Sequence, residues 1–347
     1  MESFIAGLPK VELHVHHVGS APAETVIELA SRHPASKVPK EAGELADYFA
    51  FRDFSHFIEA YVSVVDLIRT ADDVRLLTIG IARDLARQSV RYAELTVTPY
   101  SSVRRGIPAA EFMAAIEDAR IAAEAELGVV LRWCFDIPGD AGLGAAEETT
   151  RLALDVGADG LVSLGLAGRE AGVSRAQFKP YFDRARAAGL HSVPHAGETA
   201  GSESVWEALR VLGAERIGHG TTAVTDEALL RHLAEHRIPL EVCLTSNVAT
   251  RVVADAEQHP IRQLVRAGVP VTVNTDDPLM FGTDLNREYA VVARLLGLSE
   301  PQVADLAKTS VETSFMDPLA KRRLMTEIDL YLANWMAASR APGEHRA

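Results

Sequence analysis

Short apolar runs alternate with longer amphipathic segments along most of the chain. Eight of the runs have the length of a β-strand, and glycine or proline borders most of them. They are Val11–His16, Val90–Thr98, Val129–Ile137, Leu161–Leu166, Leu190–His195, Arg216–His219, Leu240–Leu244 and Val269–Asn274. The pattern predicts eight strands.

Helical periodicity separates these strands from residue 90 onward. The predicted helices are Ala109–Leu127, Ala145–Val156, Arg175–Ala188, Glu203–Leu212, Glu227–Glu235 and Pro260–Ala267. Glycine, the usual C-terminal cap, follows several helices, as at Gly128, Gly189, Gly213 and Gly268. Because strands that alternate with helices form a parallel sheet, the order predicts repeated βα units.

Two observations favour a closed (β/α)8 TIM-type barrel over an open, doubly wound α/β sheet. Polar residues gather at the C-terminal ends of the predicted strands, where barrel enzymes build their active sites. A doubly wound sheet favours a glycine-rich loop after its first strand, whereas His17-Val18-Gly19-Ser20 contains one glycine. We therefore expect a single barrel domain over residues 1–347.

Two stretches depart from the simple βα repeat. Residues 20–89 contain three predicted helices before the second strand, and we expect this insertion to form a lid over the barrel mouth. Residues 285–347 are interpreted as the last barrel helix and a C-terminal helical cap. The helices of both stretches are Pro22–Arg32, Phe54–Arg69, Asp72–Gln88, Leu285–Leu296, Pro301–Thr309 and Pro318–Ala338.

Composition and charge narrow the possible partners. Of the 347 residues, 48% are hydrophobic, which is enough for a barrel core. The net charge of −13 disfavours a nucleic-acid partner, because such a footprint needs clustered basic side chains. No apolar run approaches the roughly 18 residues of a membrane span, and the N-terminus lacks the features of a signal peptide. We expect a cytoplasmic protein with two free cysteines.

The candidate chemistry lies in four short segments at predicted strand ends. Residues two apart in a strand share a face, so His14 and His16 point the same way. His195 ends the fifth strand, and Asp276 follows the eighth. Three imidazoles and one carboxylate would bind Zn²⁺ and leave a position for water, as catalytic zinc sites do. We expect one Zn²⁺ per chain.

Further polar residues suggest what such a site would do. Bound Zn²⁺ lowers the pKa of its water from about 15.7 towards about 7. Glu198 lies close enough to His195 in sequence to act as a proton shuttle. His219 is predicted to orient the attacking oxygen, and Asp277 to face a hydrogen-bond donor of the substrate. Residues 161–168 contain no lysine that could bridge two metals, which favours a single metal ion.

Together these motifs resemble the adenosine deaminase family of the amidohydrolase superfamily. The resemblance rests on the segments Val11-Glu12-Leu13-His14-Val15-His16, His195-Ala196-Gly197-Glu198, Gly218-His219-Gly220, Thr245-Ser246-Asn247 and Asp276-Asp277-Pro278. It implies that His14, His16, His195 and Asp276 bind zinc, that Glu198 protonates purine N1, and that His219 lies beside the attacking hydroxide. It also implies that His16, Gly168 and Asp277 face the substrate, with Asp277 at purine N7.

The implied reaction is hydrolytic deamination of a 6-aminopurine nucleoside to the 6-oxopurine and ammonia. Val18 stands where the family has an aspartate that holds the ribose 5′-hydroxyl, so we expect a roomier, apolar corner there. Gly165 likewise stands where the family often has an aspartate. The motif with Val18 resembles the branch that deaminates 6-amino-6-deoxyfutalosine, an adenosine analogue extended at its 5′ position on a menaquinone route.

Three alternatives remain open from the residues alone. One is a deaminase of adenosine or deoxyadenosine proper, and another is a non-catalytic barrel that binds a nucleoside. The third is a metal-dependent phosphoesterase, for which a two-metal site is usual. The aromatic residues Phe51, Phe54, Phe57 and Tyr61 recur at helical spacing and are expected to pack in the core or the lid.

Overall fold

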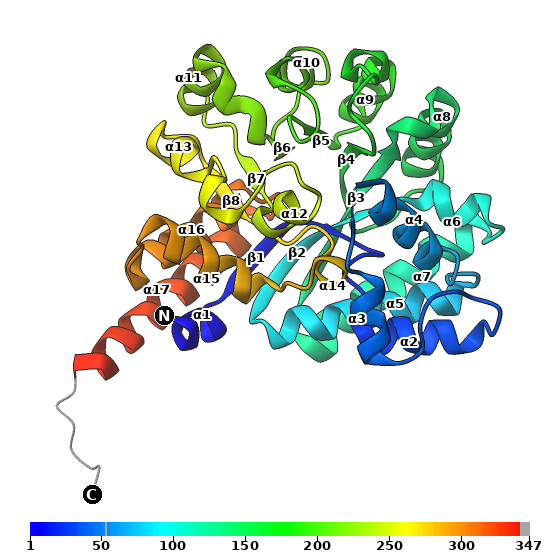
Figure 1. The fold of residues 1–347 in the computed structure, drawn as a ribbon, viewed down its shortest axis with the longest axis horizontal. Helices are drawn as coiled ribbons and strands as arrows, with labels where there is room; N and C mark the ends of the chain where they lie inside the picture. The colour runs from blue at the N-terminus through cyan, green and yellow to red at the C-terminus, as the bar shows by residue number, and fades with distance from the viewer. Residues whose placement is uncertain (53, 341–347) are drawn as a thin grey trace, which may run out of the picture.

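Eight parallel strands form a barrel in which each strand lies beside its neighbour in sequence (Figure 1). This computed structural model describes residues 1–52 and 54–340. The strands are β1 (Lys10–His16), β2 (Val90–Val97), β3 (Val130–Pro138), β4 (Leu161–Ala167), β5 (His191–Ala196), β6 (Ile217–His219), β7 (Leu240–Val242) and β8 (Val271–Val273). They follow the predicted runs, and the expected (β/α)8 barrel is confirmed.

Helices surround the barrel (Figure 1). The insertion between β1 and β2 holds α2 (Ala23–Arg32), α3 (Ala42–Tyr48), α4 (Phe54–Val65) and α5 (Ala71–Arg87). The other α-helices are α1 (Glu2–Gly7), α6 (Pro99–Arg104), α7 (Ala109–Ala122), α8 (Leu143–Arg151), α9 (Lys179–Ala187), α10 (Ser202–Arg210), α11 (Glu227–Glu235), α12 (Leu244–Ala249), α13 (Ile261–Arg266), α14 (Pro278–Phe281), α15 (Leu285–Leu296), α16 (Glu300–Thr313) and α17 (Pro318–Arg340). Wider π-helical turns extend α7 over Ala123–Leu127 and α8 over Leu152–Val156.

The C-terminal helices pack against one side of the barrel. Helix α16 packs against β1 and β8, and α17 packs against α16. The Tyr331 hydroxyl on α17 donates to the carbonyl oxygen of Phe4 at 2.8 Å, which ties the tail to the N-terminal helix. Residues 341–347 of the predicted domain lie outside the described residues. Over the described ranges, no helix has the length and apolar character needed to cross a membrane.

The seam between β8 and β1 is closed by residues that follow β8. Val15 and Asp276 form a parallel bridge, in which the His16 N–H donates to the Asp276 carbonyl oxygen at 2.7 Å. The Asp276 N–H in turn donates to the His14 carbonyl oxygen at 3.0 Å. Barrel closure therefore brings the ends of the first and last strands together at three of the predicted metal ligands.

Two details of the insertion differ from the sequence prediction. The helix α3 was not predicted, because it buries only Leu45 and so shows little apolar periodicity. The helix α4 ends at Val65, four residues before the predicted end. The Asp73 carboxylate accepts hydrogen bonds from the N–H groups of Arg69 and Thr70 at 3.1 and 3.0 Å, and these bonds form the turn that begins α5. The side chains of Phe54 and Ser55 lie outside the described residues.

The seventh strand is shorter than predicted. It ends at Val242, and the predicted strand end Leu244 instead begins α12. The apolar run crosses this boundary because Val242, Cys243 and Leu244 are all buried. Ser246 lies in the first turn of this helix, and its hydroxyl donates to Asp276 Oδ2 at 2.6 Å. The early start of α12 therefore places a hydrogen-bond donor at a predicted metal ligand.

Candidate active site

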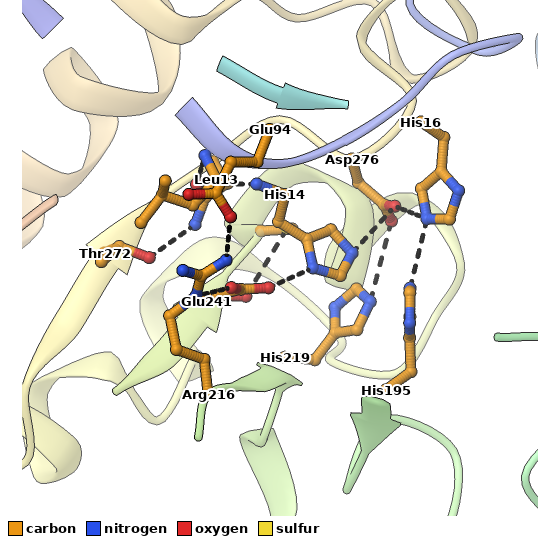
Figure 2. Close-up of polar contacts among 12 residues, drawn as sticks. Leu13, His14, His16, Glu94, His195, Arg216, His219, Glu241, Thr272 and Asp276 are labelled. Atoms are coloured by element: carbon orange, nitrogen blue, oxygen red, sulfur yellow. Dashed lines mark hydrogen bonds and ion pairs between the residues drawn. The ribbon is translucent and has the colours of Figure 1, made fainter. Parts of the chain in front are cut away.

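Four buried side chains converge at the C-terminal ends of the strands (Figure 2). The candidate ligand atoms of His14, His16, His195 and Asp276 all lie within 4.8 Å of one another. Asp276 Oδ1 is 3.2 Å from His16 Nε2 and 3.5 Å from His14 Nε2, and His16 Nε2 is 3.2 Å from His195 Nε2. The buried His14 Nε2 has no hydrogen-bond partner among the described residues. Nitrogen lone pairs that face one another in this way suit a shared cation, and the donor set fits zinc.

A carboxylate behind the cluster orients His14. Glu241 Oε2 lies 2.8 Å from His14 Nδ1, which leaves Nε2 free to face the cluster. Burial alone would raise the pKa of Glu241, but Arg216 and His14 together hold it below its ordinary value. A carboxylate on the second ring nitrogen is the usual support of a metal-bound histidine. The sequence analysis did not find Glu241, which lies inside β7 rather than at its end.

Backbone strain occurs at two of the predicted site residues. Asp276 has φ +66° and His219 has φ +63°, in the left-handed region that non-glycine residues rarely adopt. Each such conformation costs about 1–3 kcal/mol and persists only where the surrounding structure holds it. For Asp276 the bridge to Val15 and the bond from Ser246 provide that support.

Glu198 and Asp276 both lie close to His219. His219 Nε2 lies 3.9 Å from Glu198 Oε2 and 4.0 Å from Asp276 Oδ2. Burial, followed by the charges of Asp276 and Glu170, raises the pKa of Glu198 to about 8. This carboxyl is therefore protonated at neutral pH, as an acid that gives up a proton must be.

His219 is neutral, and its tautomer follows from its neighbour. Burial lowers the pKa of His219 to about 3. The Asn247 amide nitrogen lies 3.2 Å from His219 Nδ1 and can only donate, so Nδ1 accepts and the ring proton is on Nε2. His219 therefore presents an N–H donor towards Glu198 and Asp276.

The loop that carries Glu198 is held by an acid that the sequence analysis missed. Glu170 Oε2 accepts hydrogen bonds from the N–H groups of Glu198, Thr199 and Ala200 at 3.2, 3.1 and 2.8 Å. Glu170 follows β4 by three residues and is 3% exposed, so it anchors this loop from the neighbouring strand end. A lone acid 28 residues from its partner gives no sequence signal.

A cleft of about 210 Å³ opens in front of the cluster. Its walls include the predicted substrate residues His16, Gly168 and Asp277, and α4 contributes Phe57 and Tyr61. Asp277 Oδ1 is buried and has no partner in the described part of the chain, and burial raises the pKa of this carboxyl to about 7. The insertion between β1 and β2 thus contributes to the lining of the cleft through α4.

Val18 does not line this cleft. It borders a separate cavity of about 20 Å³ behind Tyr61, Thr98 and Ser101, which line both spaces. That volume holds about one water molecule, so the roomier corner expected at Val18 is not found. The neighbouring side chains Ile68, Val74 and Phe112 fill the space. Any effect of Val18 on the substrate would therefore act through the residues in front of it.

Comparisons with known proteins agree with this geometry. Residues 9–331 match the family model described as adenosine deaminase. An aminodeoxyfutalosine deaminase from Streptomyces coelicolor is 67% identical over 97% of this chain and 88% of its own length. The crystal structure of an adenine deaminase from Arthrobacter aurescens matches 94% of this chain and 99% of its own with a TM-score of 0.89 at 29% identity. An amidohydrolase from Burkholderia ambifaria with bound Zn matches 97% and 94% with a TM-score of 0.86 at 27% identity.

Proposed function

The chain belongs to the adenosine deaminase family, and we propose that it hydrolytically deaminates a 6-aminopurine nucleoside extended at its 5′ position, namely 6-amino-6-deoxyfutalosine. The observation that carries the reaction is the convergence of three imidazoles and a carboxylate, with Glu198 Oε2 close by at 3.9 Å from His219 Nε2. The substrate is supported by the 67% identity to the Streptomyces coelicolor aminodeoxyfutalosine deaminase.

We propose that His14, His16, His195 and Asp276 hold one Zn²⁺. When bound, the ion would supply an activated water at neutral pH. The unpartnered, buried Nε2 of His14 and the N₃O donor set support this assignment. The zinc reported with the Burkholderia ambifaria amidohydrolase supports the choice of metal.

The chain's own residues supply the rest of the chemistry. Glu198 gives its proton to purine N1, which draws electron density from C6 and opens it to attack. Addition of the oxygen at C6 then interrupts the aromatic ring system, and ammonia leaves from the same carbon. The N–H of His219 Nε2 orients the attacking oxygen. At the other edge of the base, a protonated Asp277 donates to N7, and the backbone of Gly168 faces the purine ring. Phe57 and Tyr61 of α4 line the cleft and would help to keep bulk water from the base.

Purified, zinc-loaded enzyme tests both the reaction and the substrate. Loss of the adenine absorbance is followed with adenosine, 2′-deoxyadenosine and 6-amino-6-deoxyfutalosine. We expect the highest kcat/KM with the extended nucleoside and loss of activity on chelation of the metal. Faster turnover of adenosine than of the extended compound would instead assign a deaminase of adenosine proper. If the loaded enzyme deaminates none of the three, the proposed reaction is wrong.

A further inference from the structure

The cleft contains more polar groups than the metal and the purine base require. Beyond the residues already given roles, Tyr61, Thr98, Ser101, Asp136 and Asp140 line it. Asp140 is exposed, and the hydroxyl groups of Tyr61, Thr98 and Ser101 can turn to suit a partner. Asp136 is the one further carboxylate buried in this wall, with 2% of its surface exposed. No residue pattern in the sequence marked it.

Asp136 lacks a hydrogen-bond donor. Its Oδ1 atom is buried and has no partner anywhere in residues 1–52 and 54–340. A buried carboxylate without donors is costly, so an unpartnered one beside a cleft indicates that a ligand provides the donor. Burial raises the pKa of Asp136 to about 7, and the positive charges of His16, His14 and Arg175 oppose that rise.

The neighbouring strand leaves room for this carboxylate. Asp136 on β3 pairs in register with Gly165 on β4. A Cβ atom at position 165 would lie 3.1 Å from Asp136 Oδ1 and 2.9 Å from Cys134 Sγ, closer than side chains normally pack. The absence of a side chain at Gly165 therefore leaves the space that the Asp136 carboxylate occupies in the cleft wall.

The chemistry of the proposed substrate shows which group Asp136 would meet. In its ionised form the Asp136 carboxylate only accepts hydrogen bonds, so a ligand that stabilises this form must offer a donor. In a 6-aminopurine nucleoside the ring nitrogens N3 and N7 are acceptors, and the 6-amino group is at the reacting carbon. Apart from the water that a bound metal ion would hold, the donors that remain are the sugar hydroxyl groups.

We propose that Asp136 is a specificity-determining residue that accepts a hydrogen bond from a sugar hydroxyl of the substrate. This inference rests on the proposed function, because it takes the orientation of the base from Glu198 and Asp277. It predicts that the enzyme selects ribonucleosides over nucleosides that lack the bonded hydroxyl. The site thus distinguishes sugars on the β3–β4 wall rather than at Val18.

A comparison of nucleosides on the wild type and Asp136→Asn tests the contact. The kcat/KM values are measured for adenosine, 2′-deoxyadenosine and 3′-deoxyadenosine. We expect the substitution to lower kcat/KM for adenosine by about tenfold, because the amide oxygen still accepts the hydrogen bond but carries no charge. For the analogue that lacks the bonded hydroxyl, the loss should stay below about threefold. Equal losses for all three nucleosides would overturn the proposal.

Two further variants separate this contact from general damage. Gly165→Ala crowds the carboxylate, so it should reproduce the selective loss for adenosine. Asp159→Asn removes an exposed carboxylate from the loop before β4 and should change none of the three values. Metal content and the unfolding midpoint of each variant are measured in parallel.

Calorimetric binding of the same nucleosides to Glu198→Gln, with and without Asp136→Asn, requires no turnover. It therefore tests the sugar contact even where the proposed deamination fails. A ribose preference that disappears with Asp136→Asn supports the proposal. A preference that survives the substitution refutes it.

Discussion

Buried charges inside the barrel and buried charges in the cleft differ in how completely they are bonded. Inside the barrel, Arg216 donates to Glu94, to Glu241 at 2.6 Å and to the Thr313 carbonyl oxygen at 3.0 Å. Glu94 also accepts from the Tyr92 hydroxyl at 3.0 Å and the Phe315 N–H at 2.8 Å. Glu94 therefore belongs to a completed network inside the barrel.

The cleft shows the opposite pattern a few residues away. Among the described residues, His14 Nε2, His195 Nδ1, Asp136 Oδ1 and Asp277 Oδ1 are buried without a hydrogen-bond partner. Folding does not leave such groups unpaired without a compensating interaction elsewhere. In this comparison the completed network lies inside the barrel and holds the fold, whereas the unpaired groups named here lie around the cleft, where a metal or substrate would bind. Glu241 joins the two regions, because it contacts both Arg216 and His14 (Figure 2).

The largest expected effect is on the cleft side, in Glu198→Gln. The amide keeps the shape of the side chain but cannot give a proton to the base, so kcat/KM should fall by roughly 10³- to 10⁴-fold. The unfolding midpoint and the zinc content should not change. Steady-state kinetics measures kcat/KM, thermal unfolding gives the midpoint, and elemental analysis gives the zinc content. Glu203→Gln, on the exposed start of α10, is the matched control and should keep wild-type activity. A fully active Glu198→Gln enzyme would remove Glu198 from proton transfer.

Inside the barrel the expected loss is of stability. Arg216→Met leaves Glu94 and Glu241 buried without their cation, and should lower the free energy of unfolding by about 3–5 kcal/mol. Urea unfolding of the metal-free protein measures this. The control Arg237→Met removes an exposed arginine, 3.7 Å from Glu312, and should cost about 0–1 kcal/mol. If the two variants lose similar free energies of unfolding, the buried network of Arg216 contributes no more to stability than an exposed ion pair does.

Glu241→Gln acts where the two regions meet. The substitution weakens the acceptor for His14 Nδ1, so zinc affinity should fall by about 10- to 100-fold. Competition with a chelator gives the affinity. Glu215→Gln is the comparison variant, since Glu215 pairs with the partly exposed His191 and should leave zinc binding unchanged. Unchanged affinity in Glu241→Gln would show that His14 needs no support from β7.

The sequence predicted the parts of the site that lie at strand ends. His14, His16, His195, Glu198, His219, Asp276 and Asp277 follow from strand periodicity, because parallel strands bring their C-terminal ends together. Glu170, Asp136 and Glu241 did not follow, since each acts through a contact between different strands that spacing does not encode. The sequence placed Val18 at the substrate. In the structure Tyr61, Thr98 and Ser101 lie between Val18 and the cleft, and such packing cannot be predicted from the position of Val18 in the sequence.

The smallest expected effect tests how Glu170 acts on Glu198. The protonated form of Glu198 is the active one, so activity is present below its pKa of about 8 and is lost as pH rises through that value. Glu170→Gln keeps an acceptor for the loop N–H groups but removes a negative charge that raises this pKa. The alkaline limb of the kcat/KM profile should therefore move to lower pH, with about a twofold loss at pH 7 if the pKa falls by about one unit. A lower rate with an unmoved limb would mean that Glu170 acts through loop geometry alone.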